Sequence, residues 1–159
     1  MKRVAWLHEG WELARSAPGA IEDPAALARA PLEWHAACVP GTVATVLHRD
    51  LDAAGPYDRD DWWYRVRFAA PERRAGARHR LRFEGLATLA EVWLNGEPLL
   101  SSRNMFVPCA ADVTDRLREA NELATMLTAE TTYGSTVAQA LERAERYWTS
   151  APGQVSDSR

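Results

Sequence analysis

Side chains that could act as nucleophiles, acids or bases are scattered along this chain and do not form a known catalytic motif. The sequence holds no G-x-S-x-G nucleophile elbow, no H-E-x-x-H zinc motif, no glycine-rich phosphate loop and no C-x-x-C pair. The histidines, His8, His35, His48 and His79, lack the i, i+4 spacing that places two metal ligands on one helix face. We therefore predict no metal site and no cofactor.

The glutamates in and near the predicted strands do not form the pair of carboxyl groups, one with a raised pKa, that a glycosidase needs. Hydrolysis of a glycosidic bond uses two carboxyl groups roughly 5 to 9.5 Å apart, one of which has a raised pKa. Glu84, Glu91 and Glu97 fall on turns or on outward positions of predicted strands, where carboxylates stay solvated. The sequence therefore predicts no catalytic residue.

A group of aspartates precedes one of the predicted strands. Asp58, Asp60 and Asp61 resemble the start of a calcium loop, but the glycine at loop position 6 and the glutamate at position 12 are missing. We interpret the group as the cap of a turn. A calcium ion held together with backbone carbonyls is the alternative.

The tryptophans are the candidates for carbohydrate binding, because the C–H face of a sugar stacks on an exposed indole. Trp63 and Trp93 fall on the strand face opposite the predicted core. The alternative is that they pack against a neighbouring domain or under a loop. Asparagine, aspartate and arginine nearby could bond sugar hydroxyls. The candidate carbohydrate-binding or interface residues are Asp61, Trp62, Trp63, Arg65, Trp93 and Asn104.

Composition excludes several classes of function. The 159 residues, 47% hydrophobic and 26% charged, suit one globular domain and are too few for a (β/α)₈ barrel of roughly 250 residues. A net charge of -3 argues against a nucleic-acid partner, and no apolar run approaches the roughly 18 residues of a membrane span. Without a signal-peptide pattern, and with Cys38 and Cys109 far apart, we predict a cytoplasmic protein with reduced, buried thiols.

The spacing of turn residues predicts an all-β domain. Glycine and proline recur at intervals of roughly 10 residues from Trp34 onward, and the segments between them alternate apolar and polar. Asn95-Gly96 predicts a tight hairpin. Three antiparallel strands in succession are predicted over 62–68, 79–84 and 89–94, and weaker ones over 11–14, 36–39, 105–108 and 121–127.

Helices are predicted only near the two ends of the chain. Asp23 followed by Pro24 is typical of a helix start, so a short helix is expected up to Ala30. Apolar residues at helical spacing predict a second helix over 137–148. We divide the chain into a domain over 1–128 and a divergent tail over 129–159.

Six short motifs, in order over roughly 11–123, carry a resemblance to a family. They are Val39-Pro40-Gly41-Thr42-Val43, Asp61-Trp62-Trp63-Tyr64-Arg65, Phe83-Glu84-Gly85-Leu86-Ala87-Thr88, Val92-Trp93-Leu94-Asn95-Gly96, Asn104-Met105-Phe106-Val107-Pro108 and Asp112-Val113-Thr114. In this order the chain resembles β-mannosidase-like members of glycoside hydrolase family 2. Those enzymes begin with a galactose-binding-like jelly-roll domain and carry both catalytic glutamates on a separate barrel.

The resemblance implies an all-β jelly-roll sandwich of the galactose-binding-like type and a non-catalytic role. The domain would pack beside a catalytic barrel that is absent from these 159 residues, and the chain alone would be inactive. The chain departs from the family in lacking, between Leu123 and Arg159, the tryptophan-rich segment that usually follows this domain. An autonomous carbohydrate-binding module for mannosides, and a truncated product without function, are the alternatives.

Overall fold

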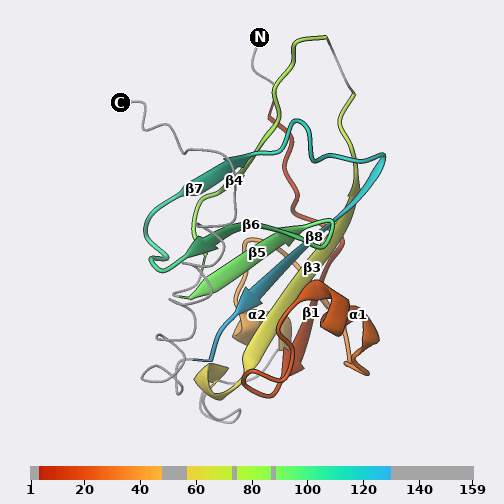
Figure 1. Cartoon of the computed structure of the whole chain (residues 1–159). Helices are drawn as coiled ribbons and strands as arrows, with labels where there is room; N and C mark the ends of the chain where they lie inside the picture. Colours follow the sequence, from red (N-terminus) through yellow and green to blue (C-terminus); the bar gives the residue numbers. More distant parts are fainter. Residues whose placement is uncertain (1–3, 48–56, 73–74, 87–88, 130–159) are drawn as a thin grey trace, which may run out of the picture.

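The computed structural model describes residues 4–47, 57–72, 75–86 and 89–129, and Figure 1 shows them as a strand-rich domain. The elements in these ranges are β1 (Trp11–Ser16), α1 (Pro24–Arg29), β2 (His35–Ala37), α2 (Val43–Leu47), the 3-10 helix η1 (Tyr57–Arg59), β3 (Asp61–Ala69), β4 (Arg80–Phe83), β5 (Ala90–Leu94), β6 (Glu97–Ser102), β7 (Cys109–Asp112) and β8 (Ala120–Leu127). The predicted all-β class is confirmed.

The strands form two antiparallel sheets of unequal size. The larger has six strands in the order β2-β1-β3-β8-β5-β6, and the smaller pairs β4 with β7 (Figure 1). The last strand among the described residues, β8, lies between β3 and β5 in the middle of the larger sheet. The strands predicted over 62–68, 79–84 and 89–94 all exist, but they do not pair with one another, because β1, β7 and β8 lie beside them instead.

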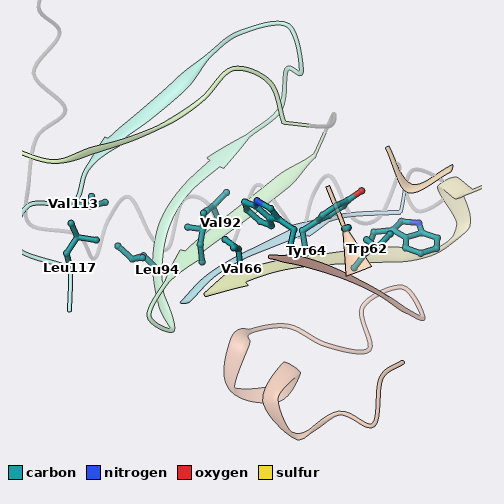
Figure 2. Packing of buried hydrophobic residues seen from close by; sticks show 11 residues of the cluster. Trp62, Tyr64, Val66, Val92, Leu94, Val113 and Leu117 are labelled. Atoms are coloured by element: carbon teal, nitrogen blue, oxygen red, sulfur yellow. The ribbon is translucent and has the colours of Figure 1, made fainter. Parts of the chain in front are cut away.

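The main core lies on the face of the large sheet that is turned toward β4 and β7. Figure 2 shows its side chains on that face, with the segment that contains α1 on the opposite side. Tyr64 and Val66 on β3 and Val92 on β5 all point into it, as their alternation predicts. The buried members are Trp11, Leu13, Ala37, Trp62, Tyr64, Val66, Val92, Leu94, Val113, Leu117 and Leu123.

The opposite face of the large sheet carries a second apolar cluster. Its buried members are Ile21, Leu27, Trp63, Trp93, Ala124 and Met126. The cover comes from residues 17–34, which fold back over the sheet and include α1. Asp23 caps α1 by accepting a hydrogen bond from the amide of Ala26 (2.7 Å), and Pro24 opens the helix. The predicted helix start is therefore confirmed.

One turn was predicted correctly and another was predicted as a strand. Asn95 and Gly96 both adopt positive φ, 55° and 83°, and join β5 to β6 as predicted. The strand predicted over 105–108 is wrong, because these residues form a turn and the strand that follows is β7. Helix α2 was not predicted. The helix predicted over 137–148 lies outside the described residues.

The two cysteines differ in exposure. Cys38 is exposed and Cys109 is half-buried, so the prediction that both thiols are buried is wrong. Cys38 follows the short edge strand β2, whereas Cys109 begins β7 and pairs with Phe83. Burial raises the pKa of the Cys109 thiol, which lowers the fraction present as thiolate.

This difference predicts unequal alkylation. At pH 8, iodoacetamide should modify Cys38 about tenfold faster than Cys109, because the thiolate is the nucleophile and Cys38 is open to solvent. Peptide mass spectrometry over a time course measures both rates. Equal rates would contradict the burial of Cys109. In a C38S protein, Cys109 is the cysteine that remains, so its rate of alkylation can be measured by itself.

Candidate functional site

The residues predicted to bind sugar do not converge on one exposed surface. Trp62 points into the main core and donates its indole N–H to the carbonyl of Tyr57 (2.8 Å). Asp61, Trp63, Arg65 and Trp93 lie on the other face of the sheet. Asn104 lies in the turn between β6 and β7. The candidates therefore divide among three environments, and each has a different role.

Asp61 is a buried structural acceptor. Its carboxylate, on a residue 2% exposed, accepts hydrogen bonds from the amides of Gly19 (2.7 Å) and Ala129 (2.8 Å). Asp60 beside it pairs instead with Arg15 at 3.6 Å. Both Asp61 oxygens are thus occupied by amides from distant parts of the chain. Asp61 therefore joins distant segments to β3 instead of capping the turn before it, and this structural role needs no calcium ion.

Trp63 and Trp93 stack on each other inside the second cluster. Their ring centroids are 5.5 Å apart at an interplanar angle of 29°. Trp63 is 0% exposed and Trp93 is 2% exposed, because residues 17–34 cover them. Their predicted position opposite the main core is correct, but neither indole is open to a sugar. The interpretation that they pack beneath a loop fits the geometry.

Arg65 closes the edge of the same cluster. Its Nε donates to a carboxylate oxygen of Glu12 at 2.7 Å, and its guanidinium lies 3.6 Å from the ring centroid of Trp34. The cation over the indole face and the carboxylate in the plane of the guanidinium satisfy the side chain from two directions. Arg65 therefore holds residues 17–34 against the sheet rather than presenting donors to a ligand.

Asn104 organises an exposed apolar turn. Its side-chain oxygen accepts from the amide of Phe106 (2.9 Å), and its carbonyl accepts from the amide of Val107 (3.3 Å). The three residues that follow it are all exposed: Met105 47%, Phe106 84% and Val107 54%. This surface was missed at the level of sequence, because a strand is predicted over 105–108.

Gly85 allows the chain to approach this turn closely. A Cβ at position 85 would lie 2.7 Å from the carbonyl oxygen of Met105, a backbone atom that cannot move aside without shifting the turn. We expect Gly85→Ala to lower the free energy of unfolding by about 1–3 kcal/mol, as overpacking does. Urea denaturation measures this. Ser101→Ala on the exposed part of β6 is the control, and an equal effect of both would contradict the close approach.

Asn121 and Glu122 belong to a polar network that joins three parts of the sheet. The amide group of buried Asn121 exchanges hydrogen bonds with the backbone of Arg118, at 2.8 Å in each direction. Asn95 donates to Asn121 and accepts from the backbone amide of Glu122. The Glu122 carboxylate binds Arg67 at 2.9 Å near the surface. These residues lock the β5–β6 hairpin to β8.

Concave and metal-binding features are weak in the described ranges. A shallow depression of about 270 Å³ lies along the N-terminal segment, lined by Trp6, Leu7, His8, Glu9, Val66, Arg67 and Phe68. Within 4–47, 57–72, 75–86 and 89–129, no three His, Cys, Asp or Glu side chains are grouped to hold a metal. None of the described helices is long and apolar enough to cross a membrane. The exposed turn is thus the most distinctive surface.

Comparison with known families and sequences identifies similar proteins. The family model described as "Glycosyl hydrolase 2 galactose-binding domain-like" matches residues 11–158. Beta-mannosidase B of Thermothelomyces thermophilus is 51% identical over 63 residues, which are 39% of this chain and 7% of that protein. Beta-mannosidase B of Emericella nidulans is 36% identical over 91 residues, 48% of this chain and 11% of that protein.

Solved structures give the same picture. The β-D-mannosidase of Dictyoglomus thermophilum has a TM-score of 0.65 at 26% identity, covering 84% of this chain and 16% of that one. A putative β-galactosidase of Bacteroides fragilis shares the fold, with a TM-score of 0.60 at 23% identity over 78% of this chain and 18% of the other. This chain therefore corresponds to a small part of each much longer relative.

Proposed function

Because the chain belongs to the glycosyl hydrolase 2 galactose-binding domain-like family, we propose that it serves as the non-catalytic N-terminal domain of a β-mannosidase-like enzyme. In this role it packs beside a catalytic barrel and helps to wall the substrate cleft. The 159 residues are too few to include that barrel themselves. A mannoside as the substrate, and a cytoplasmic location, are part of the proposal.

One observation supports a role other than sugar stacking: the indoles that were predicted to stack a sugar lie inside the domain. Trp62, Trp63 and Trp93 are all buried. A module that binds sugar by stacking needs an indole face open to solvent. Apart from Asn104, the residues named for the carbohydrate-binding alternative therefore hold the sandwich together, and the exposed apolar turn suits protein contact better.

The proposal predicts an inactive chain that supports activity when joined to a barrel. The 159-residue protein should not hydrolyse 4-nitrophenyl β-D-mannoside, because it is too short to include a catalytic barrel. A chimera tests the positive half. The whole chain replaces the matching N-terminal segment of the Dictyoglomus thermophilum β-D-mannosidase.

We expect the chimera to retain kcat/KM within about tenfold of the unmodified enzyme, a difference of about 1.4 kcal/mol. The same enzyme with the segment deleted is the control and should be inactive. A chimera as inactive as the deletion would contradict the proposal. So would saturable shifts of the buried indole resonances when the isolated chain is titrated with β-mannobiose, which would favour the binding module.

A further inference from the structure

Trp6 differs from the other tryptophans in the described ranges, because its indole is open to solvent. The residue is 66% exposed. Trp34 is half-buried, and the guanidinium of Arg65 covers one face of its ring. The tryptophans buried in the two apolar clusters are Trp11, Trp62, Trp63 and Trp93. Trp6 therefore offers the open aromatic face that stacking on a sugar ring requires, and the buried indoles do not.

The segment that carries Trp6 is fixed to the sandwich by hydrogen bonds. The indole N–H of Trp11 donates to the carbonyl of Leu7 (2.8 Å), and the amide of Val39 donates to the carbonyl of His8 (3.3 Å). The His8 ring bonds the Val39 carbonyl through Nδ1 (2.8 Å) and stacks on Trp6, with ring centroids 5.3 Å apart at 10°. One face of the indole thus lies against the imidazole. The other face is held ready for a ligand at little cost in entropy.

Polar groups line the same shallow depression as Trp6. This depression of about 270 Å³ lies between the N-terminal segment and β3, and Glu9 and Arg67 both line it. Arg67 Nε donates to Glu122 at 2.9 Å, but its Nη groups make no hydrogen bond to any described residue. The Glu9 carboxylate likewise has no partner within the described part of the chain. A guanidinium donor and a carboxylate acceptor are therefore both available to the hydroxyl groups of a ligand.

We propose that this depression binds one uncharged pyranose ring, with the C–H face of the sugar on the open face of Trp6 and its hydroxyls bonded to Glu9 and Arg67. The volume of about 270 Å³ lies below the roughly 300–1,000 Å³ of pockets for drug-sized ligands, which suits a single ring. The opposite charges of Glu9 and Arg67 favour a neutral sugar over an anionic one. The inference goes beyond the proposed function and does not depend on it, because the isolated chain carries every residue involved.

Two-dimensional NMR of the isolated 159-residue chain tests the site. Methyl β-D-mannopyranoside or methyl β-D-glucopyranoside should shift the Trp6 indole resonance saturably, with a Kd of about 1–10 mM. The backbone amides of Glu9 and Arg67 should shift with it, and the buried indoles of Trp63 and Trp93 should not. D-Glucuronate, an anionic ring of the same size, should bind more weakly than the better of the two glycosides.

Variants separate stacking from unspecific association. Trp6→Ala should weaken binding about tenfold, as followed by the amides of Glu9 and Arg67, because the aromatic contact is lost. Phe106→Ala is the matched control, since Phe106 is also exposed, at 84%, but lies in the turn between β6 and β7. It should leave the Kd unchanged. Both variants should keep the melting temperature of the wild-type chain, which shows that any loss of binding is not misfolding.

Several results would overturn the sugar site. They are no saturable shift at Trp6 with either glycoside up to about 100 mM, equal Kd values for the wild-type and W6A proteins, and tighter binding of D-glucuronate than of both glycosides. A dimer of the chain in sedimentation that W6A dissociates would assign Trp6 to a contact between copies and would also overturn it. The activity of the chimera is measured separately, so the failure of the sugar site would leave the proposed function intact.

Discussion

Replacing Trp63 with alanine should lower the free energy of unfolding by about 3–5 kcal/mol, the usual cost of truncating a large buried aromatic side chain. Trp63 is 0% exposed and stacks on Trp93 between the sheet and residues 17–34. Its indole N–H has no acceptor in the described structure, so the loss is one of packing and not of hydrogen bonding. The total free energy of unfolding of a small domain is about 5–15 kcal/mol. The variant should therefore be marginally folded at 37 °C.

Urea denaturation followed by far-UV circular dichroism measures this change. Trp6→Ala is the matched control, because the same truncation at a residue 66% exposed should change stability by no more than about 0.5 kcal/mol. Trp63→Phe should lie between the two, since a phenyl ring fills part of the cavity. A Trp63→Ala protein as stable as the Trp6→Ala protein would mean that residues 17–34 do not cover the sheet.

Replacing Asp61 with alanine should cost about 2–5 kcal/mol. The amide of buried Ala129 loses this acceptor, which costs about 1–3 kcal/mol, and the lost hydrogen bond from the exposed Gly19 to the charged carboxylate costs about 1–2 kcal/mol more. Asp61→Asn keeps one accepting oxygen and should lose about half as much. The same urea experiment ranks the variants.

Hydrogen exchange distinguishes this mechanism from a general loss of stability. In Asp61→Ala the amides of Gly19 and Ala129 should lose protection before those of the central strands β3 and β8, because only they lose a direct bond. Asp60→Ala is a suitable control, since Asp60 makes only a long ion pair at 3.6 Å with an exposed arginine. Uniform loss of protection across the sheet would contradict the direct role of the Asp61 carboxylate.

The strands could be predicted because a half-buried strand must alternate. Tyr64, Val66 and Phe68 contact the core and Arg65 and Arg67 do not, which follows from the period of two along a strand. The Asn95-Gly96 hairpin could be predicted for a similarly local reason, the positive φ of both residues. Sequence patterns within one strand or one turn were therefore enough to predict the structure of that strand or turn.

The cover over Trp63 could not be predicted, because distant residues determine it. Gly19 reaches Asp61 across 42 positions, and Trp34 meets the guanidinium of Arg65. No periodicity within β3 indicates that residues 17–34 fold back over it. The order of the strands could not be predicted for the same reason, because β8, which is distant in sequence, lies between β3 and β5. The domain boundary at residue 128 and the predicted tail helix stay predictions.

The exposed turn over 105–107 shows the opposite failure, a local signal given the wrong meaning. Its three consecutive apolar residues are compatible with a strand, but the side-chain oxygen of Asn104 accepts a hydrogen bond from the amide of Phe106 and so forms a turn. Thr42 gives a similar clue before α2, where its hydroxyl accepts from the amide of Thr45 at 3.2 Å. Side-chain acceptors of this kind are visible in the sequence. They indicate a turn or a helix start wherever an apolar run suggests a strand.

The central position of β8 determines when this domain can fold during synthesis. Until residue 127 has left the ribosome, β3 and β5 each lack the neighbour that joins them, and half of the large sheet has no contact with the other half. Ala14 can pair with Trp63 once β3 has emerged, but the pairing of Trp63 with Met126 must wait for β8. The nascent chain thus exposes unpaired strand edges until β8 emerges. A chaperone that shields these edges can act during the whole of that period.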